Sequence, residues 1–375
     1  MVNRERILNE FLELVRIASP SLAEREIAEV LKVKLNAIGL KVAEDNAGQS
    51  IGGNCGNLIA TLPSTLPQAP VLMLSAHMDN VEPCHGVKPI VSDGIIRSSG
   101  NTVLGGDDKA GLASILEALR NVKEQDIPHG EIQVVFSVAE EGSSGAKHID
   151  RSLIHANLGY VFDSSGSPGK IINKAPGENS LIFKVFGRSA HAGIEPEKGL
   201  NAVILAAKAL AQIPDGRINE ITTANIGTIN GGIATNIVPE TIAIKGETRS
   251  HNLTELQVIS EKIKGIFERS VDEQGGKSQV TVQNVYNPYE LTMDMPVISI
   301  AQAAMRKLGW DPVIKATGGG SDANYYNSYG IPCAVLGIGT QKIHTTEEYI
   351  EIEDLYKTAE LAIELIRHTG DPKTT

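Results

Sequence analysis

The chain has 375 residues, 41% of them apolar, and a formal net charge of −11. This length predicts one large or two ordinary domains. The acidic balance argues against nucleic acid as the main partner, because phosphate binding requires a basic face. The apolar runs are too short for a membrane span, and the charges spread over residues 1–20 argue against a secretory signal. Three scattered cysteines favour a reducing, cytoplasmic location over a disulfide framework.

The first half of the chain alternates helical patterns with apolar strands. We expect an amphipathic helix over 4–17 and a second helix from Ser21, where Ser21-x-x-Glu24 has the form of a capping box. A third helix is expected over 110–122. Such alternation is typical of an α/β fold built on a largely parallel sheet. The strands are predicted over residues 57–62, 71–76, 132–142 and 158–166.

The pattern changes near residue 181. A β-α-β-β-α-β order follows, which is the ferredoxin-like split arrangement. After Pro288 the α/β rhythm resumes with a helix, a glycine-rich loop, a strand and a last helix. We therefore predict a main domain in two pieces, 1–179 and 289–375, interrupted by an inserted domain over 180–288. The inserted strands are predicted over 181–187, 222–230, 240–249 and 279–286, its helices over 200–213 and 253–274, and the later elements over 297–308, 332–338 and 353–368.

The predicted strand 71–76 is followed by a histidine and an aspartate two positions apart, His77 and Asp79. Residues i and i+2 of an extended chain point to the same side, so both side chains would project together from the end of the strand. A metal-binding histidine with a carboxylate companion has this form. A surface loop that happens to contain both residues is the alternative, since H-x-D alone is a weak pattern.

Histidines or carboxylates also follow other predicted elements of this sheet. Ligand sites in parallel α/β sheets lie beyond the carboxyl ends of the strands, which places all of these side chains at one edge. Two histidines and several carboxylates form an N/O ligand set suited to zinc, manganese or cobalt, and the number of carboxylates favours two ions. Besides His77 and Asp79, the residues are Asp107, Asp108, Glu140, Glu141, Asp163 and His344.

A charge count supports a pair of ions. Two divalent ions are balanced by Asp107, Glu141, Asp163 and one bridging hydroxide, which leaves Glu140 as a proton acceptor. Successive strand residues face opposite ways, so Glu140 and Glu141 can share a site only if the chain already turns there. The following Gly142-Ser-Ser-Gly145 segment permits such a turn.

Six stretches of the chain, in the right order, resemble the dizinc exopeptidase family that includes peptidase T, aminoacylase and carboxypeptidase G. The match covers essentially the whole chain, and two of the stretches are closest to the peptidase T branch. The resemblance implies an α/β zinc exopeptidase catalytic domain of the phosphorylase/hydrolase-like class with an inserted ferredoxin-like α+β lid domain. The stretches are SAHMDNV, GGDDKAG, AEEGSSGAKHI, VFDSSG, GRSAHAG and IHTTEE, of which GGDDKAG and HTTEE carry the closer match.

Carried over residue by residue, the resemblance implies two divalent metal ions, with zinc the first choice and manganese or cobalt the alternatives. Asp107 would bridge both ions. His77 and Asp163 would complete the ligands of one ion, and Glu141 and His344 those of the other. Two ions at this spacing acidify a shared water and polarise a scissile carbonyl.

The same resemblance implies the catalytic roles. Glu140 would be the general base that takes the proton of the water and returns it to the leaving amine. Asp79 would accept the second N–H of His77 and so fix its tautomer.

The inserted domain contributes the implied substrate-binding residues. His191 would help polarise the substrate carbonyl in a closed state, and would do so across the interface if this domain forms a homodimer. Asn236 and Arg249 would hold polar ends of the substrate, since the guanidinium fork suits a carboxylate. A site assembled from two domains implies hinge closure, with hinges expected near 178–181 and 287–290.

Several residues admit a second interpretation. Asp108 adjoins Asp107 and could be the metal ligand in its place, although the resemblance points to Asp107. Arg249 could be a surface ion-pair partner. The loop over 318–324, GGGSDAN, lacks the ending of a P-loop and either lines the substrate pocket or forms a turn and helix cap.

The pair Cys84-His85 suggests a soft-metal site. We interpret it as part of a loop, because nothing else in the sequence supports a sulfur ligand set.

We therefore predict a metal-dependent exopeptidase that hydrolyses the N-terminal peptide bond of short peptides, with tripeptides as the expected substrates. It would act through a dimetal-bound hydroxide and a glutamate general base. An N-acyl amino acid amidohydrolase or a carboxypeptidase that uses the same metals is the alternative. A peptide-binding protein without catalysis is disfavoured by the complete ligand set and the intact Glu140.

Overall fold

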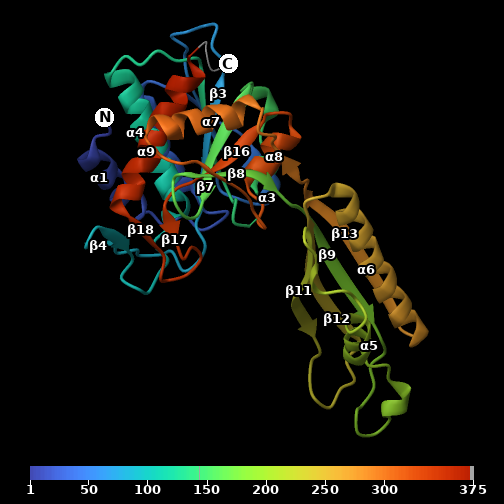
Figure 1. Ribbon diagram of the computed structural model, residues 1–375. Coiled ribbons are helices and arrows are strands. Elements are labelled where there is room, and N and C mark those ends of the chain that lie inside the picture. The colour runs from blue at the N-terminus through green and yellow to red at the C-terminus, as the bar shows by residue number, and fades with distance from the viewer. Residues whose placement is uncertain (143, 372–375) are drawn as a thin grey trace. The chain divides into compact units, whose positions relative to one another are not determined.

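The computed structural model describes residues 1–142 and 144–371, and the chain divides into two compact units (Figure 1). The sequence-based boundaries lay at 179/180 and 288/289. The main unit is Met1–Asn173, Leu291–Ala316 and Ser321–Thr375, and the small unit is Lys174–Glu290 and Thr317–Gly320. Within the described part of the chain, no helix combines the length and the apolar character needed to cross a membrane.

The main unit is built on a nine-stranded sheet with the order β1-β2-β6-β3-β7-β16-β8-β14, in which β15 also pairs with β8. The four central strands, β6, β3, β7 and β16, are parallel, and the strands on either side of them pair antiparallel. The strands are β1 Lys41–Glu44, β2 Leu58–Leu62, β3 Leu72–His77, β6 Ile132–Ser137, β7 Leu158–Ser164, β8 Lys170–Ala175, β14 Tyr289–Glu290, β15 Val313–Ala316 and β16 Cys333–Gly337.

The prediction of an α/β fold is confirmed, and the predicted parallel sheet is parallel at its centre only. The central strands β3, β6 and β16 are buried along their whole length, which explains their uninterrupted apolar runs. Of the strands outside this centre, β2 was predicted over 57–62, whereas β1, β8, β14 and β15 are partly exposed and were not predicted. A second, four-stranded sheet consists of β17 Thr340–Gln341, β18 Tyr349–Glu351, β5 Ile95–Arg97 and β4 Ile90–Ser92.

Helices cover the main sheet. α4 packs on β3 and β7 and is in contact with α1, α2 and α9, while α7 packs on β7, β16 and α9 (Figure 1). α4 is buried almost throughout, charged residues such as Lys109 and Glu117 included. The helices are α1 Arg4–Leu14, α2 Arg25–Ile38, α3 Ala47–Ile51, α4 Gly106–Glu124, α7 Pro296–Lys307, α8 Asp322–Ser328 and α9 Ile352–Thr369, with the short 3-10 turns η1 Gly145–His148 and η2 Arg151–Leu153.

The predicted helix start at Ser21 is wrong. α2 begins at Arg25, and its N-terminus has no side-chain cap. The Ser21 hydroxyl donates to the Asp79 carboxylate instead, and Leu22 has a positive φ of 74°. Glu24 accepts hydrogen bonds from the backbone N–H groups of Leu22 and Ala139. The capping-box residues therefore serve the site described below, and the helix starts after them.

The small unit contains a five-stranded antiparallel sheet with the order β10-β11-β12-β9-β13. Its element order adds β10 to the predicted β-α-β-β-α-β pattern. The core lies between this sheet and its two helices, where the rings of Phe183 and Phe267 are 4.7 Å apart. The elements are β9 Gly177–Phe186, the 3-10 turn η3 Pro196–Lys198, α5 Ala202–Leu210, β10 Gly216–Asn219, β11 Thr222–Gly231, β12 Thr241–Ser250, α6 Leu253–Glu273 and β13 Lys277–Tyr286.

Two phenylalanines on β9 test this core. Phe183 is fully buried, whereas Phe186 on the same strand is 40% exposed. Phe183→Ala should lower the free energy of unfolding of the small unit by about 3–5 kcal/mol, because it removes buried apolar surface and leaves a cavity. The matched variant Phe186→Ala should cost clearly less. Urea unfolding measures both, and equal losses would contradict the assigned core.

Candidate active site

His77 is the last residue of β3 and is almost completely buried. Its Nε2 atom lies 3.2 Å from Oδ1 of Asp107 and 3.7 Å from Oδ1 of Asp163. Its Nδ1 atom lies 3.2 Å from Oδ1 of Asp79. The imidazole thus lies between the Asp79 carboxylate on its Nδ1 side and the carboxylates of Asp107 and Asp163 on its Nε2 side. This is the arrangement of a metal-binding histidine with an orienting carboxylate.

Asp79 connects His77 to the segment after β6. Its carboxylate is fully buried and accepts hydrogen bonds from the backbone N–H groups of Glu140, at 2.9 Å, and Glu141, at 3.2 Å. Although burial opposes the charged form, contact with His77 keeps the pKa of Asp79 below its usual value. One carboxylate therefore fixes both the histidine and the two glutamates.

The turn needed for two adjacent glutamates to share a site is present. β6 ends at Ser137, and residues 140–142 form a turn. Ala139 has a positive φ of 52°, a conformation that costs free energy for a residue with a side chain. Glu24 and Asp79 hold this turn through its backbone N–H groups.

Asp107 lies between the two histidines. Its Oδ1 atom is 3.2 Å from Nε2 of His77, and its Oδ2 atom is 3.4 Å from Nε2 of His344. His344, which has a positive φ of 62°, also lies 2.9 Å from Oε1 of Glu141. Each oxygen of Asp107 therefore faces a different histidine, as a carboxylate that bridges two metal ions must.

Asp108 has a different environment from Asp107, to which it is joined by a cis peptide bond. Its carboxylate accepts hydrogen bonds from the backbone N–H groups of His77, at 3.1 Å, and Gly111, at 3.2 Å. This engagement with the backbone supports Asp107 as the ligand.

Two groups of potential ligands overlap at His77. In the first, His77, Asp107 and Glu141 each offer an atom within 4.8 Å of the others, and in the second His77, Glu140 and Asp163 do so. The structure thus brings together all seven residues predicted for the metals and the catalysis. Their individual roles stay predictions. The seven are His77, Asp79, Asp107, Glu140, Glu141, Asp163 and His344.

The electrostatics of this cluster favour bound cations. Burial raises the pKa of Glu140 and of Asp163 well above the usual range, and neighbouring carboxylates add to the effect. The carboxylates of Asp107 and Glu141 raise the pKa of His344 to about 10. The carboxylates therefore repel one another, and they favour the protonated form of Glu140, Asp163 and His344. Divalent cations would relieve the same repulsion.

One oxygen is left without a hydrogen bond. Among the described residues, the buried Oε1 atom of Glu141 has no hydrogen-bond partner, although it lies 2.9 Å from Nε2 of His344. A carboxylate oxygen and an imidazole nitrogen at this separation could both contact one cation. Together with the nitrogen and oxygen donor set, this separation fits residues that could hold divalent metal ions.

Sequence reasoning missed two carboxylates that support the site. Glu348 is buried and accepts hydrogen bonds from the backbone N–H groups of Gly105, at 2.7 Å, and Asp107, at 3.0 Å. Asp322 accepts hydrogen bonds from the hydroxyls of Ser137 and Ser144 on either side of the glutamate turn. Glu348 lies in the IHTTEE stretch and Asp322 in the glycine-rich loop. The local sequence does not reveal which backbone or hydroxyl groups their carboxylates contact.

The glycine-rich loop ends in a helix cap. Ser321 caps α8 and forms a capping box with Asn324. This bears out the helix-cap interpretation for Ser321, and it leaves Asp322 free to support the turn that carries Glu140.

The three predicted substrate-binding residues lie in the small unit. The segments of His191 and Asn236 run side by side, and the backbone N–H of Ala192 donates to the backbone oxygen of Asn236 at 2.9 Å. The guanidinium of Arg249 forms ion pairs with Glu247, at 2.8 Å, and Glu178, at 3.0 Å. The ion-pair interpretation of Arg249 is thus realised, and the substrate contacts of all three residues stay predictions.

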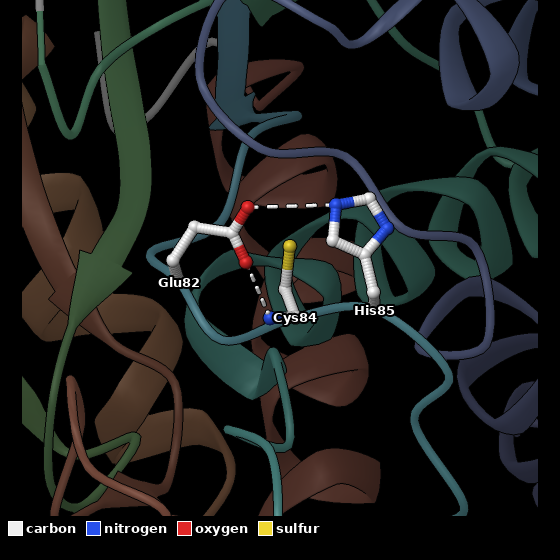
Figure 2. Close-up of side chains that lie close together, drawn as sticks. All are labelled: Glu82, Cys84 and His85. Atoms are coloured by element: carbon white, nitrogen blue, oxygen red, sulfur yellow. Dashed lines mark hydrogen bonds and ion pairs between the residues drawn. The ribbon is translucent and has the colours of Figure 1, made fainter.

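A further group of potential ligands lies in the loop after β3. Figure 2 shows the Cys84 sulfur near the Glu82 carboxylate and the His85 ring, and one ligand atom from each lies within 4.8 Å of the others. Glu82 accepts from the Cys84 N–H at 3.0 Å and lies 3.4 Å from the His85 ring. Glu82 and His85 are exposed, and the segment is a loop, as predicted. An exposed ion pair accounts for this geometry.

The central position of Asp79 can be tested with Asp79→Asn. The amide would offer an N–H where the carboxylate accepts one, so the glutamate turn and His77 would lose their orientation. We expect metal affinity to fall about 10–100-fold, measured by competition with a chromogenic chelator. Asp45→Asn is the matched control, since Asp45 is also buried and accepts backbone N–H groups. Equal effects of the two variants on metal affinity would contradict the assignment.

Comparisons with known proteins agree with this geometry. Residues 73–368 match the model of peptidase family M20/M25/M40. The chain is 43% identical to the uncharacterized protein YqjE of Bacillus subtilis, over 99% of this chain and 100% of that protein. It is 27% identical to peptidase T of Escherichia coli strain SE11, again over 99% and 100%.

Solved structures give the same result. A tripeptidase from Staphylococcus aureus superposes with a TM-score of 0.93 at 42% identity, over 99% of each chain. An aminopeptidase PepT from Bacillus cereus superposes with a TM-score of 0.90 at 43% identity, over 99% of this chain and all of that one. The family match spans more than half of the sequence and includes every residue of the cluster. The chain therefore belongs to peptidase family M20/M25/M40.

Proposed function

We propose that this protein is a metal-dependent aminopeptidase that removes the N-terminal residue of short peptides, with tripeptides as its substrates. The observation that carries the proposal is the position of Asp107, whose two oxygens face His77 and His344 within a buried group of carboxylates. Relatives described as a tripeptidase and as an aminopeptidase cover nearly the whole chain at 42% and 43% identity.

The residues divide naturally between two divalent ions, for which zinc is our first choice and manganese or cobalt the alternatives. His77 and Asp163 would hold one ion, Glu141 and His344 the other, and Asp107 both. When bound, such ions polarise the scissile carbonyl and acidify a water molecule. The carboxylates bring the negative charge that would retain the ions.

Glu140 is the residue we assign to proton transfer. Its backbone N–H is held by Asp79, and its side chain offers an oxygen in the same group as His77 and Asp163. From this position it would accept the proton of the attacking water and deliver it to the nitrogen of the leaving peptide. His77 would keep its tautomer through Asp79, which also accepts the backbone N–H of Glu140.

The small unit would supply substrate contacts through His191 and Asn236, as the sequence predicted. Arg249 already has two carboxylate partners, so a substrate carboxylate would have to compete with Glu178 and Glu247 for it. A homodimer formed through this unit and a cytoplasmic location stay predictions.

Glu140→Gln tests the proton-transfer assignment. The amide has nearly the same shape but cannot accept the proton, so kcat for a tripeptide should fall about 10²–10⁴-fold or more while both metal ions are retained. Steady-state kinetics with metal analysis on the same sample measures this. Glu347→Gln, at an exposed glutamate near the site, is the control. Full activity of Glu140→Gln would overturn the assignment.

A matched set of peptides tests the substrate class. A free tripeptide, its N-acetylated form and its C-amidated form are incubated with metal-loaded protein, with Glu140→Gln as background. We expect acetylation to abolish hydrolysis and amidation to be tolerated, because an aminopeptidase reads the free amine. Cleavage of the acetylated peptide with rejection of the amide would identify a deacylase or carboxypeptidase.

Removal of the metals should destabilise the fold. Ligands that bind only the folded state add about 2.7 kcal/mol at a hundredfold excess over their dissociation constant, and here they also relieve carboxylate repulsion. We expect a chelator to lower the melting temperature and zinc or manganese to restore it. In Asp107→Asn both responses should be largely lost. A melting temperature that is indifferent to chelation in the wild type would contradict a dimetal centre.

A further inference from the structure

A cavity of about 520 Å³ in the main unit lies outside the cluster described above, and none of its lining residues belongs to that cluster. It is lined by residues from three separate parts of the chain. The loop between β7 and β8 contributes Gly166 and Gly169, the segment before and within β15 contributes Trp310 and Lys315, and α9 contributes Lys357. Lys170, at the start of β8, is the third lysine of the wall.

The charge of this cavity contrasts with that of the chain. The whole protein carries a net charge of −11, yet three lysines line the cavity against a single acidic residue, Asp311. Of these lysines, Lys357 is paired with Asp354 at 3.1 Å. A concave surface with one sign of charge concentrates the opposite ion.

Lys170 and Lys315 lack acidic partners. Among the described residues, neither forms an ion pair with a carboxylate, and the ammonium of Lys170 donates to the backbone oxygen of Ser165. Burial lowers the pKa of Lys170, and the nearby charge of Lys315 lowers it further. Lys170 and Lys315 thus both line one cavity and repel each other, and an anion bound between them would offset that repulsion.

We propose that this cavity binds a phosphate group. Lysine ammonium groups act as point charges that converge from separate directions, which suits the oxygens of a tetrahedral dianion, whereas planar carboxylates favour the arginine fork. Gly166 and Gly169 let the ligand approach the backbone closely. Trp310 forms a planar apolar wall that accommodates an organic group attached to the phosphate. Free phosphate and a phosphorylated small molecule share this chemistry, and the experiment separates them.

Trp310 is the only tryptophan of the chain and lines this cavity, so its fluorescence is a probe of binding there. Metal-loaded protein is titrated with inorganic phosphate and, separately, with adenosine monophosphate, at constant ionic strength. We expect a saturable change in emission. Equal affinities identify phosphate itself as the ligand, and tighter binding of the nucleotide identifies a phosphorylated organic molecule. The absence of a saturable change with both compounds overturns the proposal.

Lysine variants exclude binding at the metal centre as the source of the signal. In the double variant K170Q/K315Q the dissociation constant should rise about tenfold or more, because two charge-assisted contacts are lost. Lys41→Gln is the matched control, since Lys41 is exposed and β1 lies at the opposite edge of the sheet from β8. Unchanged tripeptide hydrolysis shows that the double variant is folded. An unchanged dissociation constant in that variant overturns the proposal.

Discussion

The buried carboxylate of Asp79 is the interaction on which the site depends. It contacts the imidazole of His77 at the end of one strand, and it accepts the backbone N–H groups of Glu140 and Glu141 after the next. It also receives the hydroxyl of Ser21 from the loop before α2. A buried charge is tolerated only when its hydrogen bonds are satisfied, and here these bonds are the ones that set the geometry of the ligands.

The sheet explains why a single carboxylate can reach so many parts of the chain. β6, β3, β7 and β16 are adjacent and parallel, so the residues that follow β6, β3 and β7 emerge at the same edge. His77, the glutamate turn and Asp163 are delivered there. Apolar burial of the strands fixes their register, and the register sets the spacing of the ligands to within the short distances observed.

Burial and neighbouring carboxylates oppose the ionisation of Glu140, Asp108 and Asp163 at this edge, and raise the pKa of each. Asp107, Asp108, Glu140, Glu141 and Asp163 lie close together and largely buried, with two histidines as the nearest basic groups. Backbone strain at Ala139 and His344 adds to the cost. Bound divalent cations would offset this repulsion, and the packed sheet holds the ligands in place.

Much of this could be predicted from the sequence, because buried parallel strands have continuous apolar runs and the polar residues at their ends stand out. The residues that merely support the ligands were harder to predict. Ser21 and Glu24 have the spacing of a helix cap. Only the fold shows that Ser21 donates to Asp79 and that Glu24 accepts the backbone N–H of Ala139. Glu348 contacts the backbone of Asp107, and the lysines that line the cavity with Trp310 come from distant parts of the chain. A local sequence pattern cannot predict contacts between residues so far apart in the chain.

The central claim is that Asp107 joins two metal ions, and an anomalous difference map from crystals of zinc-loaded protein tests it most directly. The account predicts two peaks in the cluster, one beside each oxygen of Asp107, with His77 and Asp163 at the first and Glu141 and His344 at the second. A single peak, or a second peak elsewhere in the protein such as at Glu82, Cys84 and His85, would contradict it.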